Sequence, residues 1–358
     1  MQADMKGRGA AENPPNRFEH LALERDPDWN EPDDPAPKTQ FFRDATASLI
    51  TYNDSPDVGF EASINPYRGC EHGCIYCYAR PYHEYLGFSA GLDFETKIVV
   101  KENAPELLRR ELSSRKWKLQ VLAMSGVTDP YQPIERRLKL TRHCLEVLVE
   151  FRNPVAIVTK NHLVTRDIDL LSELAGHNAA AVYVSITTLD ADLARIMEPR
   201  TAQPPARLRA IDELTRAGVP AGVMVAPVIP GLTDHELPSI IKAAGEAGAR
   251  FAGFVPVRLP LAVAELFEQW LARHMPDRKE KVLAQIRAIR GGKLNDPNFG
   301  SRMRGEGIFA EQMAKMFEVA CRKAGITERG PHLSTAAFRR PGSPQMELFA
   351  ENGGGGGS

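Results

Sequence analysis

The chain has 358 residues, a formal net charge of −1 and charged side chains at 25% of its positions. This near-neutral balance excludes a protein that attracts nucleic acid over its whole surface, so any such binding would depend on a local patch. The length allows one large domain or two ordinary ones. The sequence shows neither an apolar run long enough to span a bilayer nor a signal-peptide segment, so we expect a cytoplasmic protein without a membrane partner.

The N-terminal region is polar and rich in proline, with the runs Asn13-Pro14-Pro15-Asn16 and Pro32-Asp33-Asp34-Pro35-Ala36-Pro37. This composition is typical of chain that lacks enough apolar surface to form a core. We expect residues 1–58 to form an N-terminal extension that is partly disordered.

From about residue 59, short apolar runs alternate with segments of helical periodicity. The predicted strands are 62–64, 119–124, 155–159, 181–186, 222–226 and 251–255. The predicted helices between them are 105–114, 135–151, 166–175, 190–197, 205–217 and 234–247. Strands that are apolar on both faces and alternate with helices predict a parallel sheet covered by helices, and therefore an α/β fold.

Beyond residue 262 the pattern is helical, with expected helices at 263–275, 279–289 and 308–324. We therefore expect a helical C-terminal extension over residues 263–335. Residues 336–358 are expected to form a flexible tail, which ends in the linker-like sequence Gly-Gly-Gly-Gly-Gly-Ser.

Three cysteines follow the first predicted strand, and their spacing is C-x3-C-x2-C: Cys70, Cys74 and Cys77. The two other cysteines, Cys144 and Cys321, are scattered, which suits a reducing compartment and a metal site better than a disulfide framework. Three thiolates do not complete the shell of an ordinary four-thiolate cluster, so one iron would stay open to a substrate or cofactor.

Gly69 and Gly73 flank the first two cysteines and would let the loop wrap tightly around a cluster. Two alternatives stay open at this point. His72 or His83 would complete a zinc site as a fourth ligand, or the three thiols would be unrelated.

The cysteine spacing, with Tyr76 directly before the third cysteine, resembles the signature of the radical S-adenosylmethionine (SAM) superfamily. The resemblance implies an open (β/α)6 partial TIM barrel over residues 59–262, a [4Fe–4S] cluster held by the three cysteines, and SAM bound to the open iron. It also implies cleavage of SAM to a 5′-deoxyadenosyl radical, with a reductase, flavodoxin or ferredoxin as electron donor. Tyr76 is then expected to point away from the cluster and pack near the adenine.

The superfamily usually carries a Gly-Gly-Glu-like element after the second strand, and this chain does not. Here the sequence reads Ser125-Gly126-Val127-Thr128-Asp129. We expect Ser125, Thr128 and Asp129 to accept hydrogen bonds from the SAM ammonium, with Gly126 allowing close backbone approach. An ordinary turn is the alternative.

Three further SAM-binding residues are predicted near later strand ends. Lys160 ends the third predicted strand and Ser185 lies in the fourth, where a cation and a small hydroxyl suit the SAM carboxylate and ribose. Arg200 follows Glu198-Pro199 and would pair with the SAM carboxylate through its planar fork. A purely structural Glu–Arg pair is the alternative for this segment.

Segments 78–81, 128–132, 159–160, 185–187 and 226–231 resemble the spore photoproduct lyase-like branch of the superfamily, in an uncharacterised subgroup of DNA repair photolyase-like proteins. The namesake splits a thymine dimer in DNA, so the resemblance implies a lyase-like reaction. That enzyme carries a hydrogen-donating cysteine just ahead of the residue that matches Asp129, and this chain has none there. We expect Cys144, on the next helix, to be a buried core residue, so the namesake's own reaction is not expected.

Two features indicate DNA as the substrate. The Gly-rich loop 290–305 offers Lys293, Arg302 and Arg304 to phosphates and Phe299 to a base, although a packed turn would also explain it.

The tail sequence Gln345-Met346-Glu347-Leu348-Phe349 resembles the peptide with which bacterial DNA polymerases and repair enzymes bind the sliding clamp. Leu348 and Phe349 would fill an apolar pocket, and Gln345 would anchor the extended backbone. Chance occurrence of so short a motif is the alternative.

The leading hypothesis is a radical SAM enzyme that acts on DNA, through lesion repair or base modification. A second hypothesis keeps the radical chemistry and changes the substrate to RNA, a peptide or a small metabolite. A third hypothesis is an iron–sulfur sensor without turnover.

Overall fold

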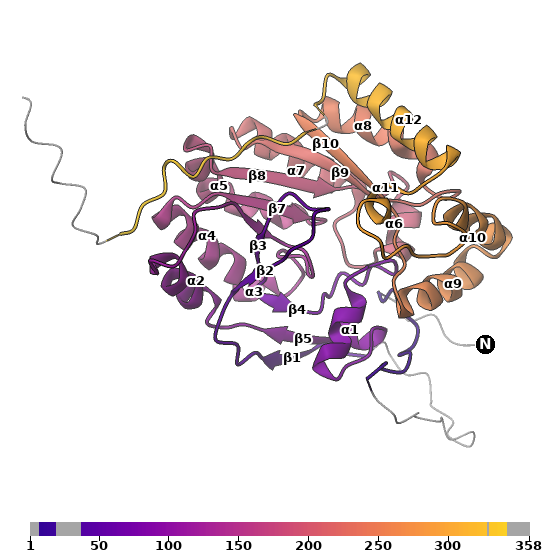
Figure 1. Ribbon diagram of the computed structural model, residues 1–358, viewed down its shortest axis with the longest axis horizontal. Helices are drawn as coiled ribbons and strands as arrows, with labels where there is room; N and C mark the ends of the chain where they lie inside the picture. Colours follow the sequence, from indigo (N-terminus) through magenta and orange to yellow (C-terminus); the bar gives the residue numbers. More distant parts are fainter. Residues whose placement is uncertain (1–6, 19–36, 328, 342–358) are drawn as a thin grey trace, which may run out of the picture.

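The computed structural model describes residues 7–18, 37–327 and 329–341 (Figure 1). The clamp-binding candidates Gln345, Leu348 and Phe349 lie outside the described residues. Within the described residues the strands are β1 (Gln40–Arg43), β2 (Ile50–Tyr52), β3 (Ala62–Ile64), β4 (Tyr67–Arg68), β5 (Lys97–Val100), β6 (Leu122–Met124), β7 (Val155–Thr159), β8 (Ala180–Ser185), β9 (Ala221–Val228) and β10 (Phe251–Pro256).

The helices follow the same chain order and include four short 3-10 segments. They are η1 (Arg80–Leu86), α1 (Leu92–Thr96), α2 (Ala104–Ser113), α3 (Glu135–Leu138), α4 (Leu140–Phe151), η2 (His162–Asp167), α5 (Ile168–Gly176), α6 (Ala191–Met197), α7 (Pro204–Arg216), η3 (Asp234–Glu236), α8 (Leu237–Glu246), α9 (Ala262–His274), η4 (Pro276–Arg278), α10 (Lys279–Ala288), α11 (Ser301–Arg304) and α12 (Ile308–Ala324).

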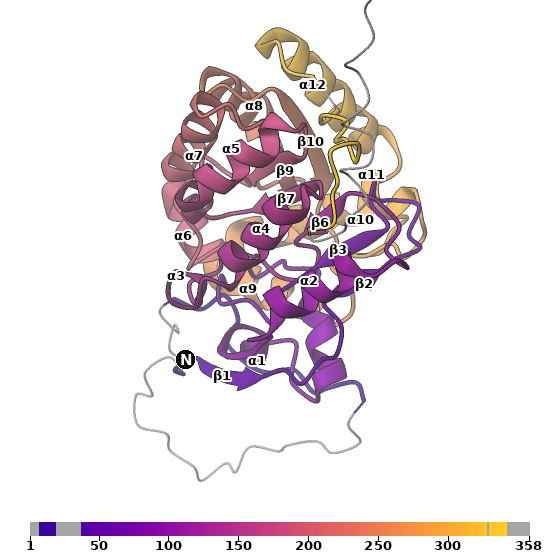
Figure 2. The ribbon, with the colours of Figure 1, turned by 90° about the vertical axis from the view of Figure 1, so that its left-hand side faces the viewer.

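The larger sheet has the strand order β10-β9-β8-β7-β6-β3-β2. All neighbours in it are parallel except β2, which is antiparallel to β3. Helices α4, α5, α7 and α8 form a layer over the outer face of this sheet (Figure 2). The expected open (β/α)6 partial barrel is therefore confirmed, and functional residues are expected where the parallel strands end.

The predicted helix 135–151 is wrong in one respect, because the structure divides it into α3 and α4. Lys139 stands between them with a left-handed φ of 55°. The buried carboxylate of Glu135 accepts a hydrogen bond from the backbone N–H of Thr141 at 3.0 Å. A side chain from one helix thus caps the next, which a periodicity argument does not detect.

Other boundaries differ by a single turn. The helices predicted at 166–175 and 234–247 begin later, at α5 and α8, because the 3-10 turns η2 and η3 precede them. The strand predicted at 119–124 is shortened to β6. The structure also forms β1, β2, β4 and β5, which the sequence did not predict because these short strands carry no clear alternation of apolar and polar residues.

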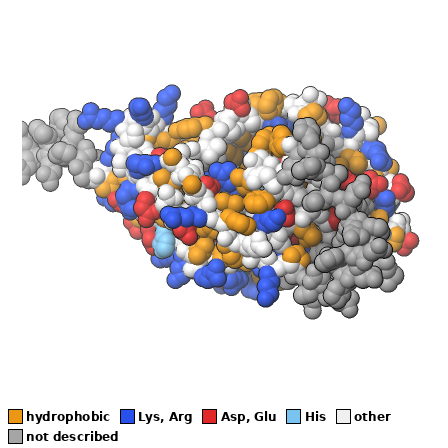
Figure 3. Space-filling model, turned by 90° about the horizontal axis from the view of Figure 1, so that it is seen from below, with side chains coloured by type: hydrophobic (Ala, Val, Ile, Leu, Met, Phe, Trp, Pro, Cys, Tyr) orange, Lys and Arg blue, Asp and Glu red, His pale blue; other side chains and the backbone are white. Residues whose placement is uncertain are grey.

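Strands β1, β5 and β4 form a second, three-stranded sheet. In β1 the side chains of Phe41 and Phe42 are exposed, and the guanidinium of Arg137 lies 5.4 Å from the Phe41 ring centroid. Seen from below Figure 1, this side of the molecule shows hydrophobic side chains between Lys and Arg (Figure 3).

The C-terminal helices pack onto the barrel and share its core. The rings of Phe254 on β10 and Phe317 on α12 lie 4.7 Å apart, and Met313 joins the same core cluster. Helices α9 and α10 instead share a cluster with Cys74 and Ile75 of the cysteine loop. Among the described residues, none of the helices is long and apolar enough for a membrane span.

Candidate active site

The cysteine loop lies between β4 and η1, and none of its three thiols is in a disulfide. Cys70 and Cys74 are buried and Cys77 is half-buried. Cys77 packs against the small core cluster that contains Cys70, and its backbone N–H donates to the Cys74 carbonyl at 3.2 Å. Burial raises the pKa of all three thiols. Binding iron as thiolates therefore requires each thiol to lose a proton on loading.

Two glycines shape the loop as the sequence predicts. Gly69 and Gly73 have φ values of +76° and +66°, which side-chain-bearing residues rarely adopt. A Cβ atom at Gly73 would also lie 2.7 Å from the Glu95 carboxylate. The loop backbone therefore approaches its surroundings too closely for any other residue.

Arg80 stabilises this loop through hydrogen bonds to backbone carbonyl groups. Its guanidinium is fully buried and donates to the carbonyl oxygens of Cys74 at 2.9 Å and Gly91 at 2.9 Å. It also pairs with the fully buried carboxylate of Glu95 at 2.5 Å. A planar donor with several N–H groups can hold both backbone segments and the carboxylate at once.

The N-terminal segment 7–18 packs directly on the cysteine loop. The backbone N–H groups of Gly9 and Ala10 donate to the Glu95 carboxylate at 3.0 and 2.9 Å. A Cβ atom at Gly9 would lie 1.8 Å from the carbonyl oxygen of Gly73. The N-terminal segment therefore forms part of the packing around the cysteine loop.

The two histidines proposed as zinc ligands have other surroundings. The ring nitrogens of His72 lie 3.2 Å from Asn161 Nδ2 and 3.4 Å from the Asp129 carboxylate. The His83 ring packs beside Phe88 and Phe94, and burial lowers the pKa of His83 to about 4. In the part of the chain that the structure describes, no three His, Cys, Asp or Glu side chains are grouped to hold a single metal ion.

A network of buried charges lies where the strands end, and it contains two predicted residues, Lys160 and Tyr76. The Lys160 ammonium lies 3.3 Å from the Glu198 carboxylate, and the Tyr76 hydroxyl donates to the same carboxylate. Arg207 of α7 pairs with the other oxygen of Glu198. Burial alone would raise the pKa of Glu198, but Arg207 and Lys160 hold it well below its ordinary value.

Asp129 organises the neighbouring strand ends. Its carboxylate accepts hydrogen bonds from Thr159 Oγ1 and from the Lys160 backbone N–H, both at 2.7 Å. Burial would raise the pKa of Asp129, but His72 and these donors lower it. The backbone N–H of Asp129 also donates to the Cys70 sulfur. Asp129 therefore links the cysteine loop to the strands.

The other predicted residues of this segment have local roles. Ser125 has a φ of 151°, which is rare for a residue with a Cβ, and its hydroxyl donates to the Thr128 carbonyl at 3.3 Å. The Gly126 carbonyl accepts a hydrogen bond from the Tyr78 hydroxyl. Thr128 donates to the Tyr67 carbonyl at 3.3 Å. Strain of this kind is concentrated at functional sites, and a SAM-binding role for these residues stays a prediction.

Ser185 and Arg200 contact different partners, and a SAM-binding role for both stays a prediction. Ser185 is buried, and its carbonyl accepts a hydrogen bond from Arg207 at 3.0 Å. Arg200 forms an ion pair at 3.1 Å with Glu71 of the cysteine loop, on the side that faces α3 and α7. The Glu–Arg pairs of this region are therefore Glu71–Arg200 and Glu198–Arg207.

The basic loop predicted from the sequence is tied to the end of β10. The half-buried Arg302 pairs with Asp57 and lies 4.4 Å from the ring centroid of Phe299, which is 57% exposed. Lys293 and Arg304 are exposed. Buried Arg290 donates to the carbonyls of Val257 and Arg302, both at 2.8 Å, and fixes the loop there.

Sequence reasoning missed the buried ionic residues Arg80, Glu95 and Arg207. One signal was present for Arg207, which occupies an apolar face of its helix with Ala210 and Ile211. A charged residue at a core position of an amphipathic helix indicates a buried partner. No comparable signal marks Glu95.

The family model of the radical SAM superfamily matches residues 64–244 of this chain. The chain belongs to the radical SAM superfamily. It is 40% identical over 251 residues to an uncharacterised protein of Mycobacterium tuberculosis, covering 68% of this chain and 72% of that protein. It is 28% identical over 173 residues to the radical SAM Nalpha-GlyT isomerase of Pseudomonas phage M6, covering 48% of this chain and 34% of that enzyme.

Among solved structures, this radical SAM protein resembles spore photoproduct lyase complexed with dinucleoside spore photoproduct. The TM-score is 0.57 at 16% identity, over 79% of this chain and 78% of that one, which shows a shared fold. Membership of the family implies a [4Fe–4S] cluster and SAM, as the sequence predicts. The three free, grouped thiols of Cys70, Cys74 and Cys77 fit the cluster, since each would bind a different iron.

Proposed function

We propose that this radical SAM enzyme acts on DNA, by repairing a lesion or modifying a base. When bound, the cluster and SAM supply a 5′-deoxyadenosyl radical that abstracts a hydrogen atom from the substrate. The observation that carries the proposal is the position of the basic loop 290–305. The loop predicted to bind DNA lies at the carboxyl end of β10, and its Leu294 packs against the core cluster that contains Cys74 and Ile75 of the cysteine loop.

The link between the two loops runs through Arg258. Its guanidinium lies 4.7 Å from the ring centroid of Tyr78, which directly follows Cys77, and it donates to the Met303 sulfur at 3.3 Å. Tyr78, Tyr82 and Phe299 are 41%, 55% and 57% exposed. Exposed aromatic rings between arginines suit single-stranded or flipped bases, which stack on rings while cations contact phosphates.

The comparisons support a nucleoside-containing substrate without establishing it for this chain. Spore photoproduct lyase, which shares the fold, was solved with a dinucleoside photoproduct. The phage relative is named an isomerase, which supports rearrangement of a substrate radical as a second route. Cys144 is fully buried in the core, as the sequence predicts, so it supplies no hydrogen donor to the site.

The reaction is tested by deuterium transfer. We expect 5′-deoxyadenosine formed with dithionite, SAM and deuterated DNA to carry deuterium, because the radical would take its hydrogen atom from DNA. Deuterated RNA and peptide pools serve as comparisons, with mass spectrometry of 5′-deoxyadenosine as the readout. Cys74→Ala is the control and should show neither cluster absorbance nor 5′-deoxyadenosine. Deuterium transfer only from RNA or from peptide would contradict the proposal.

Binding to the sliding clamp through the tail is a separate prediction. We expect the wild-type chain to be retained on immobilised bacterial clamp and Leu348→Ala plus Phe349→Ala to be lost, because the two side chains would fill its apolar pocket. The matched control is Met346→Ala, which changes the same peptide outside the pocket-filling positions. Equal retention of wild type and the double variant would remove this partner.

A further inference from the structure

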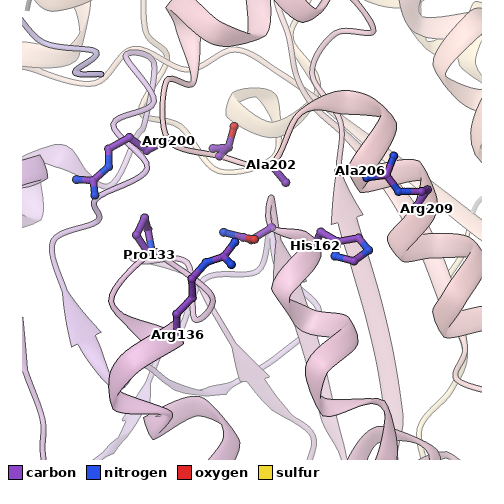
Figure 4. Close-up of a pocket in the computed structure, with 9 residues that line it drawn as sticks. Pro133, Arg136, His162, Arg200, Ala202, Ala206 and Arg209 are labelled. Carbon is purple, nitrogen blue, oxygen red and sulfur yellow. The ribbon is translucent and has the colours of Figure 1, made fainter. Parts of the chain in front are cut away.

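A cavity of about 310 Å³ lies beside the cysteine loop, and its lining includes neither Tyr78 nor Arg258. Its walls come from four places: the segment after β6, the segment after β7, the loop between α6 and α7, and the start of α7. Figure 4 shows Arg136 reaching toward the loop between α6 and α7 that carries Ala202, with His162 and Arg209 on the other side.

The cavity is lined by cations and by no acidic side chain. Arg136, Arg200 and Arg209 contribute three guanidinium groups, and His162 adds an imidazole. Two carboxylates reach the lining from outside: Glu71 forms an ion pair with Arg200, and Glu213 lies beside the His162 imidazole, each at 3.1 Å. Two glutamates thus face three arginines, which leaves a positive excess.

Arg136 and Arg209 account for that excess. Both are exposed, and neither side chain forms an ion pair or hydrogen bond within the described residues. They stand on α3 and α7, two elements that are remote in sequence, yet they line one cavity. A guanidinium presents N–H donors in a plane that matches the oxygen atoms of a phosphate group.

The cavity is connected to the cysteine loop by two contacts. Arg200 pairs with Glu71, and Asn161 lies 3.2 Å from His72. Glu71 and His72 separate the first two cluster cysteines in the sequence. A group bound in the cavity would therefore contact residues that themselves contact Glu71 and His72, the neighbours of the cluster cysteines.

We propose that this cavity is a phosphate-binding site. The phosphate would belong to the backbone of a nucleic acid or to a free phosphate ester, and the first source rests on the proposed function. A nucleic acid bound here and at the basic loop would pass across the cysteine loop, with its phosphates at Arg136 and Arg209.

The test compares Arg136→Ala plus Arg209→Ala with Arg195→Ala plus Arg216→Ala. The control removes two exposed arginines outside the cavity, one of them on α7 itself. Both proteins are reconstituted anaerobically, and their cluster absorbance and circular dichroism should match those of wild type. One arm titrates a fluorescent single-stranded oligonucleotide and follows its anisotropy over a range of salt. The other arm titrates inorganic phosphate by calorimetry.

For each lost phosphate contact, we expect the cavity variant to bind the oligonucleotide about tenfold more weakly and its salt slope to fall by about 1. The control should behave like wild type in both arms. Loss of inorganic phosphate binding alone would support the site with a free phosphate ester as its ligand. Arginine-dependent phosphate binding without deuterium transfer from DNA would leave the site standing and remove the proposed substrate.

Unchanged binding of both ligands by the cavity variant would overturn the proposal, and deuterium transfer from DNA in the same variant would leave the proposed function intact. A variant that binds phosphate and DNA normally but is no longer reduced by an acidic flavodoxin would also overturn it, and would identify the cavity as a protein-docking surface.

Discussion

Arg80→Ala is expected to lower the free energy of unfolding by about 3–5 kcal/mol and to prevent cluster loading. The substitution leaves the fully buried Glu95 carboxylate without its cation. It also removes the donors that hold the Cys74 and Gly91 carbonyls. Urea denaturation of anaerobic protein measures the first effect, and iron content after reconstitution measures the second.

Two variants separate charge from geometry at this position. Arg80→Lys keeps a cation for Glu95 but lacks the planar fork, so it should recover part of the stability and little of the iron content. Arg43→Ala, at a side chain that is 78% exposed, should change the unfolding free energy by less than about 0.5 kcal/mol. Wild-type iron content in Arg80→Ala would show that the loop holds its shape without this residue.

Arg207→Ala is expected to have a similar cost in stability, about 3–5 kcal/mol, and to weaken SAM binding as well. Arg207 is fully buried and pairs with Glu198, whose carboxylate also binds Lys160 and the Tyr76 hydroxyl. Without Arg207, the Lys160 ammonium would be attracted more strongly to the Glu198 carboxylate. Urea denaturation and equilibrium dialysis of SAM measure the two effects.

A double-mutant cycle with Glu198→Gln tests whether the pair acts as a unit. We expect the double variant to be more stable than the sum of the single losses implies, with a coupling of about 0.5–3 kcal/mol. Arg216→Ala, on the same helix but 79% exposed, is the matched control. Additive losses would mean that Arg207 acts only through its bonds to the Ser185 and Ala202 carbonyls and the Thr201 hydroxyl.

The sequence predicts the parts of this protein that depend on short-range patterns. The spacing of Cys70, Cys74 and Cys77 is local, and so is the apolar character of the six parallel strands, so both the cluster loop and the barrel were predicted. Pro204 and Pro205 stand at the first positions of α7, where a helix accepts proline.

The partners of buried charges could not be predicted in the same way. Lys160 was identified, but its partner Glu198 and the partner of that residue, Arg207, come together only when α7 packs against η2, the turn that follows β7. Arg200 and Glu198 are neighbours in sequence and pair with different residues. Tertiary contacts set these pairings, and the same limit explains the break at Lys139, where a carboxylate caps the following helix.

The contact between Gly9 and the Gly73 carbonyl has a practical consequence for anyone who shortens or tags this protein. The sequence predicts a partly disordered extension here, yet the backbone N–H groups of Gly9 and Ala10 donate to the Glu95 carboxylate that Arg80 also binds. A truncation that begins at β1 would strip those donors and expose the back of the cofactor loop to solvent and oxygen. Truncations that shorten this protein should therefore leave residues 7–18 in place.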